Sequence, residues 1–149
     1  SLSADGTVVA VGAYANDGNG SNSGHVRVYY FSNGVWLKMG QDIDGEAEYD
    51  YSGWTVSLSS DGSRVAIGAH RNDDNGYNAG HVRIYEYNSN NSNWAQLGSD
   101  IDGEAANDQS GYAVSLSSDG SRVAIGAQYN DGNGNNAGHV RLYEYTSSS

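Results

Sequence analysis

Two groups of polar side chains have the residue types and the spacing to bind a metal ion. Asp131, Asn133 and Asn135 would place oxygen atoms at positions 1, 3 and 5 of a short loop, as calcium-binding loops do. The second group has four carboxylates within nine residues, which are Asp100, Asp102, Glu104 and Asp108. Neither group is a complete calcium loop, and the same side chains also shape turns and accept hydrogen bonds from backbone N–H groups. The sequence therefore leaves two interpretations open, Ca²⁺ binding and a structural role.

A third candidate site is a loop that varies while its surroundings do not. Two repeated segments share 27 of 35 aligned residues, and four of the eight differences fall in this loop. Loops on a rigid frame often carry binding residues, so we expect ligand contacts here, although random drift in an exposed loop would look the same. The candidate contacts, with one residue from the N-terminal repeat, are Tyr14, His70, Arg71, Asp74, Tyr77, Gln128, Tyr129 and Asn135.

A repeated pattern of short strands must position these loops. Ser115–Ala127 repeats Ser57–Ala69 residue for residue, and a looser copy opens the chain at Ser1. Period-two alternation of apolar residues and Asp-Gly or Asn-Gly turns predict strands and hairpins. The strands expected in the middle repeat are residues 53–59, 64–69, 81–87 and a fourth strand that carries Trp94 and Leu97.

Four antiparallel strands in each repeat, without any helical pattern, predict an all-β fold made of β-propeller blades. The chain would be a single repeat domain of about two and a half blades. Residues 1–51 form blade one with an incomplete first strand, residues 52–109 form blade two, and residues 110–149 form blade three without its fourth strand. Because a ring needs about 4–8 blades, we expect either further blades of a longer chain or a homo-oligomer.

Charge is distributed unevenly over this fold. Successive turns of an up-and-down blade alternate between its two ends, so 13 of the 18 acidic residues should lie on one face. A net charge of −11 argues against nucleic acid as a partner, and no apolar run is long enough for membrane insertion. His25, His81 and His139 recur at a strand start in every repeat, which favours contacts between blades over a ligand role.

The repeated motifs resemble the FG-GAP repeat, the blade unit of the integrin α-subunit propeller. The resemblance is carried by Ser110-Gly111-Tyr112, by Val123–Ala127 and by Gly138–Tyr143. It implies a ring of usually seven blades, an extracellular or cell-surface setting, and a role in binding or adhesion. The family's Asp-x-Asp-x-Asp-Gly calcium loop is replaced here by the shorter Ser60–Ser63.

These observations predict a non-catalytic binding or adhesion propeller outside the cell or at its surface. Its acidic loop face would contact a protein or glycan ligand, and Ca²⁺ is the one cofactor that the sequence suggests. An enzyme is not expected, because catalysis needs one asymmetric constellation and these carboxylates are copied from repeat to repeat. The alternative is a structural building unit of a surface filament, sheath or other homo-assembly.

Overall fold

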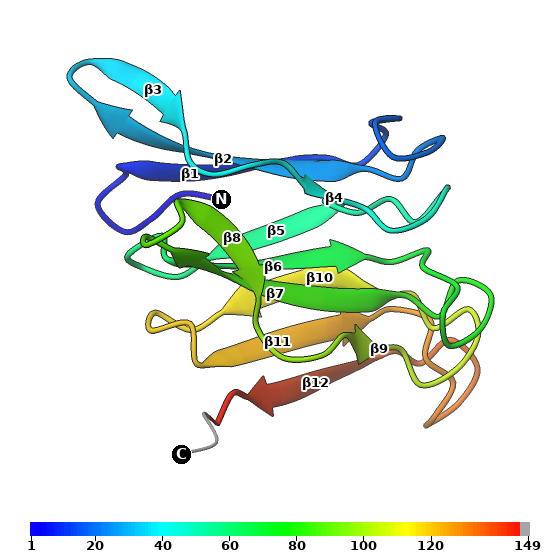
Figure 1. The fold of residues 1–149 in the computed structure, drawn as a ribbon. Helices are drawn as coiled ribbons and strands as arrows, with labels where there is room; N and C mark the ends of the chain where they lie inside the picture. Colours follow the sequence, from blue (N-terminus) through cyan, green and yellow to red (C-terminus); the bar gives the residue numbers. More distant parts are fainter. Residues whose placement is uncertain (147–149) are drawn as a thin grey trace.

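The computed structural model describes residues 1–146, which fold into three antiparallel sheets stacked face to face (Figure 1). The first sheet contains β1 (Val8–Ala13), β2 (His25–Ser32), β3 (Val35–Lys38) and β4 (Ile43–Asp44). The second contains β5 (Thr55–Leu58), β6 (Arg64–Ala69), β7 (His81–Asn88), β8 (Asn93–Gln96) and β9 (Ile101–Asp102). The third contains β10 (Ser110–Leu116), β11 (Arg122–Ala127) and β12 (His139–Glu144). The predicted all-β class is confirmed, and the sheets are consistent with propeller blades; we call them the first, second and third blade.

In each blade neighbouring strands pair in chain order, except that β4 pairs with β2 and β9 pairs with β7. Residues 1–146 contain no helix at all, so they offer no apolar helix long enough to cross a bilayer. In the second blade β6 lies between β5 and β7, and five of its six residues are buried. The near-continuous apolar run of this strand follows from its position, because a neighbouring blade covers each of its faces.

The fourth strand differs from the prediction. It is expected to include Leu97, but β8 ends at Gln96, and the chain then swings away near Gly98, whose φ is +79°. It returns as β9, which pairs with the start of β7 although the sequence suggests only a connection there. The outer strand is therefore split into two pieces. The same split separates β3 from β4 in the first blade.

Hairpin turns close the end of each blade that is opposite the long loops. Asn33 and Gly34 have φ values of +51° and +82°, the two positive angles that a type I′ turn requires. In the Ser-Asp-Gly-Ser turn, Asp61 Oδ1 accepts hydrogen bonds from Ser59 Oγ (2.7 Å) and from Ser63 N (2.9 Å). The bond from Ser63 lowers the pKa of Asp61. The Asp61 carboxylate therefore stabilises its own turn by accepting local hydrogen bonds.

The apolar core lies between blades. Val26 and Val28 on β2 belong to one buried cluster with Val65 and Ile67 on β6. A second cluster joins Val82 on β7 to residues of β11 in the third blade. Each blade therefore presents one apolar face to the blade before it and another to the blade after it.

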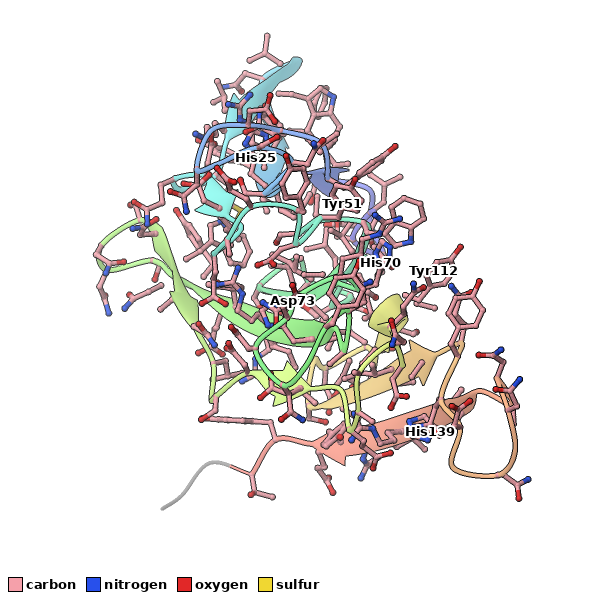
Figure 2. The ribbon with its side chains drawn as sticks, turned by 90° about the vertical axis from the view of Figure 1, so that its right-hand side faces the viewer. His25, Tyr51, His70, Asp73, Tyr112 and His139 are labelled. Atoms are coloured by element: carbon pink, nitrogen blue, oxygen red, sulfur yellow. The ribbon has the colours of Figure 1, made fainter. Side chains whose placement is uncertain are left out.

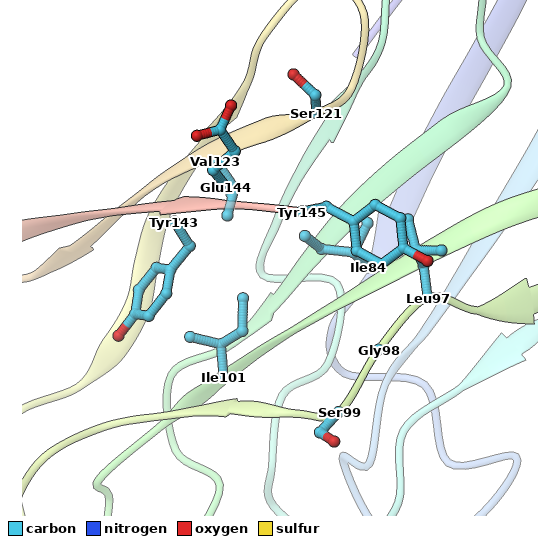
Figure 3. Close-up of a pocket in the computed structure, with 10 residues that line it drawn as sticks. All are labelled: Ile84, Leu97, Gly98, Ser99, Ile101, Ser121, Val123, Tyr143, Glu144 and Tyr145. Carbon is cyan, nitrogen blue, oxygen red and sulfur yellow. The ribbon is translucent and has the colours of Figure 1, made fainter. Parts of the chain in front are cut away.

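A tryptophan closes the first interface at its outer edge. The Trp94 indole N–H donates to the Met39 carbonyl oxygen at 2.7 Å and packs beside Gly40. In the second interface the corresponding slot, beside Leu97 and Gly98, is an open apolar cleft (Figure 3). Its walls also include Ile84, Ile101, Val123 and Tyr143. No residue among 1–146 fills this slot as Trp94 fills the first.

The position of Val82 between two blades predicts a large effect of its truncation. Val82 is fully buried, whereas Val140, at the same position of the third repeat, is 69% exposed. We expect Val82→Ala to lower the free energy of unfolding by about 2 kcal/mol, because it removes buried methyl groups and leaves a cavity. Val140→Ala is the matched control and should change it by less than about 0.5 kcal/mol. Urea unfolding measures both, and equal effects would contradict the interblade core.

Candidate functional site

The long loops and the connections between blades gather at one end of the stack, on the right-hand side of Figure 1. The loops are residues 14–24, 70–80 and 128–138, and the connections are residues 45–54 and 103–109. We call this surface the loop end. The antiparallel order of the strands brings these segments together, because alternate turns of a meander lie at the same edge of a sheet.

Buried Asp–Asn pairs tie each connection to the next loop. Asp108 accepts a hydrogen bond from the Asn130 side chain at 2.7 Å and another from the backbone N–H of Ala105 at 3.2 Å. Asp50 makes the same two bonds with Asn72 and Ala47. Burial raises the pKa of Asp50. For Asp108 these contacts agree with the structural interpretation of the sequence, since the carboxylate orders the connection.

The Asp131 loop is also organised by its own hydrogen bonds. Asp131 Oδ1 accepts from the backbone N–H of Asn136 at 2.6 Å, and Asp73 does the same in the second repeat. The counterpart of Asn133 is Asn75, whose side-chain amide donates to the Gly103 carbonyl oxygen at 2.7 Å. Asn133 and Asn135 are exposed. In this loop the pattern of oxygen-bearing residues therefore serves backbone bonding, while Ca²⁺ binding there stays a prediction.

The four carboxylates of the second predicted group lie in different surroundings. Glu104 lies 3.4 Å from Arg141 Nη1 and 3.7 Å from His139 Nδ1. Asp100 lies 3.8 Å from His81 Nδ1 of the same blade, and Asp102 is exposed. Within residues 1–146, only Asp100 of the six predicted ligands belongs to a cluster of metal-binding side chains, which also contains Glu46, Asp74 and His81.

A row of aromatic side chains crosses the loop end where β5 and β10 begin. We call it the aromatic row; its members are Tyr14, Tyr51, Trp54, His70 and Tyr112. His70 is its centre, with ring centroids 4.7 Å from Trp54 and 5.5 Å from Tyr112. Figure 2 shows His70 between Tyr51 and Tyr112, apart from His25 and His139. Tyr14, Trp54 and Tyr112 each keep more than a third of their surface exposed.

Glycine allows this row to form. A Cβ atom on Gly68 would lie 2.2 Å from the carbonyl oxygen of Gly111, so a side chain at Gly68 would overlap the third blade. Gly12 faces Gly53 in the same way, at 2.0 Å. Trp54 directly follows Gly53, and Tyr112 directly follows Gly111. The close backbone approach thus brings aromatic rings from successive blades within stacking distance.

The predicted contact residues are spread over the loop end. Tyr14 and His70 belong to the aromatic row, and the Arg71 guanidinium lies 4.8 Å from the centroid of Tyr51. The Gln128 side chain donates a hydrogen bond to Gln109 at 2.8 Å. Gln128 occupies the position of His70 one repeat later, and Gln109 occupies that of Tyr51. Of the remaining candidates Tyr77, Tyr129 and Asn135 are exposed without a described side-chain partner, and Asp74 is exposed in the cluster with His81.

The sequence analysis missed Tyr51, Trp54 and Tyr112 as site residues. The comparison of repeats selects positions that vary within one loop, whereas Tyr51 and Trp54 come from the connection before β5, and Tyr112 lies near the start of β10. A signal was present, since Trp54 and Tyr112 are large aromatic residues directly after a glycine. Of the three histidines predicted to contact neighbouring blades, His25 and His81 are buried, whereas His139 is partly exposed.

Burial of His70 predicts pH-dependent stability. Desolvation, helped by Arg71, lowers the pKa of His70 to about 4, and the pKa of His81 is lowered similarly. The unfolded chain therefore binds more protons between about pH 4 and pH 6.5, so stability is complete above that range and falls as pH decreases through it. The loss due to His70 is on the order of 3 kcal/mol.

The replacement His70→Gln introduces the residue that the third repeat already has at this position. We expect the variant to lose less stability than the wild type between pH 7 and pH 4. Chemical denaturation at a series of pH values gives the comparison, and parallel curves for the two proteins would refute the assignment.

Comparison with known proteins identifies one matching family and a solved structure with a similar fold. A model of the FG-GAP repeat matches residues 43–85 and 100–143. Each match begins at the last strand segment of one blade, β4 or β9, and ends within the third strand of the next blade. No curated protein matches the chain.

The solved structures include a protein from Bacteroides uniformis ATCC 8492 that is named as a 6-phosphogluconolactonase. It aligns with a TM-score of 0.64 and 14% sequence identity, over 99% of this chain and 35% of its own. The chain thus spans about a third of that protein, and the likeness concerns the fold alone. The two family matches together cover more than half of the sequence, and their strands are those of the stacked blades. The chain belongs to the FG-GAP repeat family.

Proposed function

We propose that these blades form a non-catalytic binding surface whose loop end contacts a protein or glycan ligand at the cell surface or outside the cell. The aromatic row is the observation that carries the proposal. Its rings lie side by side, are partly exposed and cross from one blade to the next. Tyrosine and tryptophan surfaces of this kind stack well on apolar or ring-shaped groups and are enriched at binding interfaces.

The surroundings of the aromatic row fit such a ligand. Arg71 adds a cation above Tyr51, and the acidic loops provide carboxylate and amide groups that can hydrogen-bond to a polar ligand. The buried Asp–Asn pairs hold these loops in place, so little ordering is needed on binding. Their repetition in successive blades supports a scaffold role over acid–base catalysis, which needs two carboxyl groups in unlike environments.

Removal of Trp54 tests this function. We expect Trp54→Ala or Tyr112→Ala to weaken binding at least about tenfold, because central aromatic contacts often contribute 2 kcal/mol or more. The chain would be screened on arrays of glycans and extracellular proteins, and hits would be quantified by surface plasmon resonance. The screen would be run with and without millimolar Ca²⁺, the ion that the sequence suggests for this face.

Trp36→Ala is the matched control, because Trp36 is 46% exposed but lies on β3, away from the aromatic row. It should bind as the wild type does. If Trp54→Ala and Trp36→Ala bind every hit equally, the loop end is not the contact surface.

Two exposed apolar faces favour a second candidate, a structural building unit. Val140 and Leu142 on β12 are exposed, although Val82 at the position of Val140 is buried against the third blade. Val11 on β1 is also exposed, whereas Ile67 at its position is buried. The exposed apolar face of the third blade and the exposed apolar face of the first blade therefore have the same residue pattern as the two faces that pack together inside the stack. We infer that another blade of this type, from a longer chain or from a second copy, packs there.

The mass of the purified chain as a function of concentration tests this assembly. We expect oligomers that grow with concentration, because contacts of this head-to-tail kind extend unless a ring closes. A single closed species would favour a ring and argue against a filament. Leu142→Asp should give monomers in either case, since it places a charge in the interface. A wild-type chain that is monomeric at every concentration would contradict self-assembly.

A further inference from the structure

His81 has a buried ring nitrogen that lacks a hydrogen-bond partner. The residue begins β7 and is only 1% exposed, and its Nδ1 atom makes no hydrogen bond to the described residues. Nδ1 lies 3.8 Å from Asp100 Oδ2 and 4.0 Å from Glu46 Oε2, which is too far for hydrogen bonds. Since buried polar atoms almost always have partners, this nitrogen points to a missing one.

The atoms that Nδ1 faces are suited to share a metal ion with it. One ligand atom from each of Glu46, Asp74, His81 and Asp100 lies within 4.8 Å of the other three. In zinc sites nitrogen and oxygen ligands lie about 2.0–2.2 Å from the ion, so two ligand atoms on one ion are separated by up to about 4 Å. The separations of Asp100 Oδ2 and Glu46 Oε2 from Nδ1 fall within this limit, and Asp74 has a ligand atom within 4.8 Å of the others.

Neighbouring side chains hold one oxygen of each carboxylate and leave the other free. Arg83 Nη1 contacts Glu46 Oε1 at 3.0 Å, while Glu46 Oε2 is the atom nearest to His81. Gln96 Nε2 donates to Asp100 Oδ1 at 2.5 Å, while Asp100 Oδ2 faces His81. Outer contacts of this kind orient metal ligands in proteins.

The charges around the cluster also suit a cation. Three carboxylates, Glu46, Asp74 and Asp100, belong to it, and the ion pair of Glu46 with Arg83 offsets part of their charge. Metal binding requires a nitrogen ligand with a free lone pair, which a neutral imidazole provides.

We propose that Glu46, Asp74, His81 and Asp100 bind a divalent first-row transition-metal ion, with Zn²⁺ as the best-suited member. An imidazole nitrogen among carboxylates favours such ions over Ca²⁺ and Mg²⁺, which prefer oxygen ligands alone. The ion would clamp the connection after the first blade, through Glu46, to the loop and strands of the second. This site does not depend on the proposed ligand-binding function.

The other repeats contain natural variants of the site. Gly18 and Gly132 occupy the position of Asp74 in the first and third repeats. In the first repeat the counterpart of Asp100 is Asp42, which is paired with Arg27 and Lys38. Among residues 1–146 the full set of four ligands therefore occurs once, where the connection after the first blade meets the second blade.

Calorimetric titration of the metal-free chain tests the proposal. We expect one Zn²⁺ per chain, together with a higher melting temperature, whereas millimolar Ca²⁺ should not compete. Asp74→Gly makes the second repeat like its neighbours, and Glu46→Gln removes a second ligand. Each should weaken Zn²⁺ binding at least tenfold. Asp74 and Glu46 are exposed, so both variants should fold, which circular dichroism checks.

Glu104→Gln is the matched control, because it makes the change of Glu46→Gln at the same position one repeat later. It should bind Zn²⁺ as the wild type does. The ¹⁵N resonance of His81 Nδ1 should shift at a Zn²⁺ concentration that saturates the wild type, and Asp74→Gly should need at least tenfold more Zn²⁺ for the same shift. The proposal is overturned if Zn²⁺ does not bind, if all three variants bind it equally, or if Ca²⁺ displaces it.

Discussion

The stack of blades depends on one steric constraint, the contact of backbone with backbone where β1 and β6 face the start of the next blade. Gly68 lies so close to the Gly111 carbonyl oxygen that even a methyl group would overlap it, and Gly12 faces Gly53 in the same way. These contacts limit the spacing of the blades. At that spacing valine and isoleucine side chains from facing sheets fill the space between them, as the density of a protein interior requires.

The two ends of each blade differ in how completely their polar groups are satisfied. At the hairpin end, the Asp61 carboxylate is bonded by the serines on both sides of it. At the loop end, Asp50 and Asp108 accept hydrogen bonds from neighbouring segments, whereas the buried Nδ1 atoms of His70 and His81 have no hydrogen-bond partner among the described residues. The side chains that could bind a ligand or an ion therefore lie at the loop end, while the side chains at the hairpin end stabilise the turns.

Much of the fold could be predicted from the sequence, because repetition turns weak local signals into strong ones. The β6 and β7 segments and the Asn33-Gly34 turn follow from alternation and turn chemistry, which are local properties. The split outer strand could not be predicted, since β9 has two residues and forms through pairing with β7 far along the chain. The clustering of Asp100 with Glu46 also depends on the distance between two blades, and spacing along the chain does not encode it.

The glycines at positions 18 and 132 suggest how one blade of such a repeat can gain a binding site during evolution. Glycine and aspartate codons differ by a single base, and this loop position is exposed in all three repeats. One mutation can therefore add or remove the carboxylate of Asp74 without disturbing the blade beneath it. An array of near-identical blades then carries several equivalent places where a site can be tried, while the remaining copies preserve the scaffold.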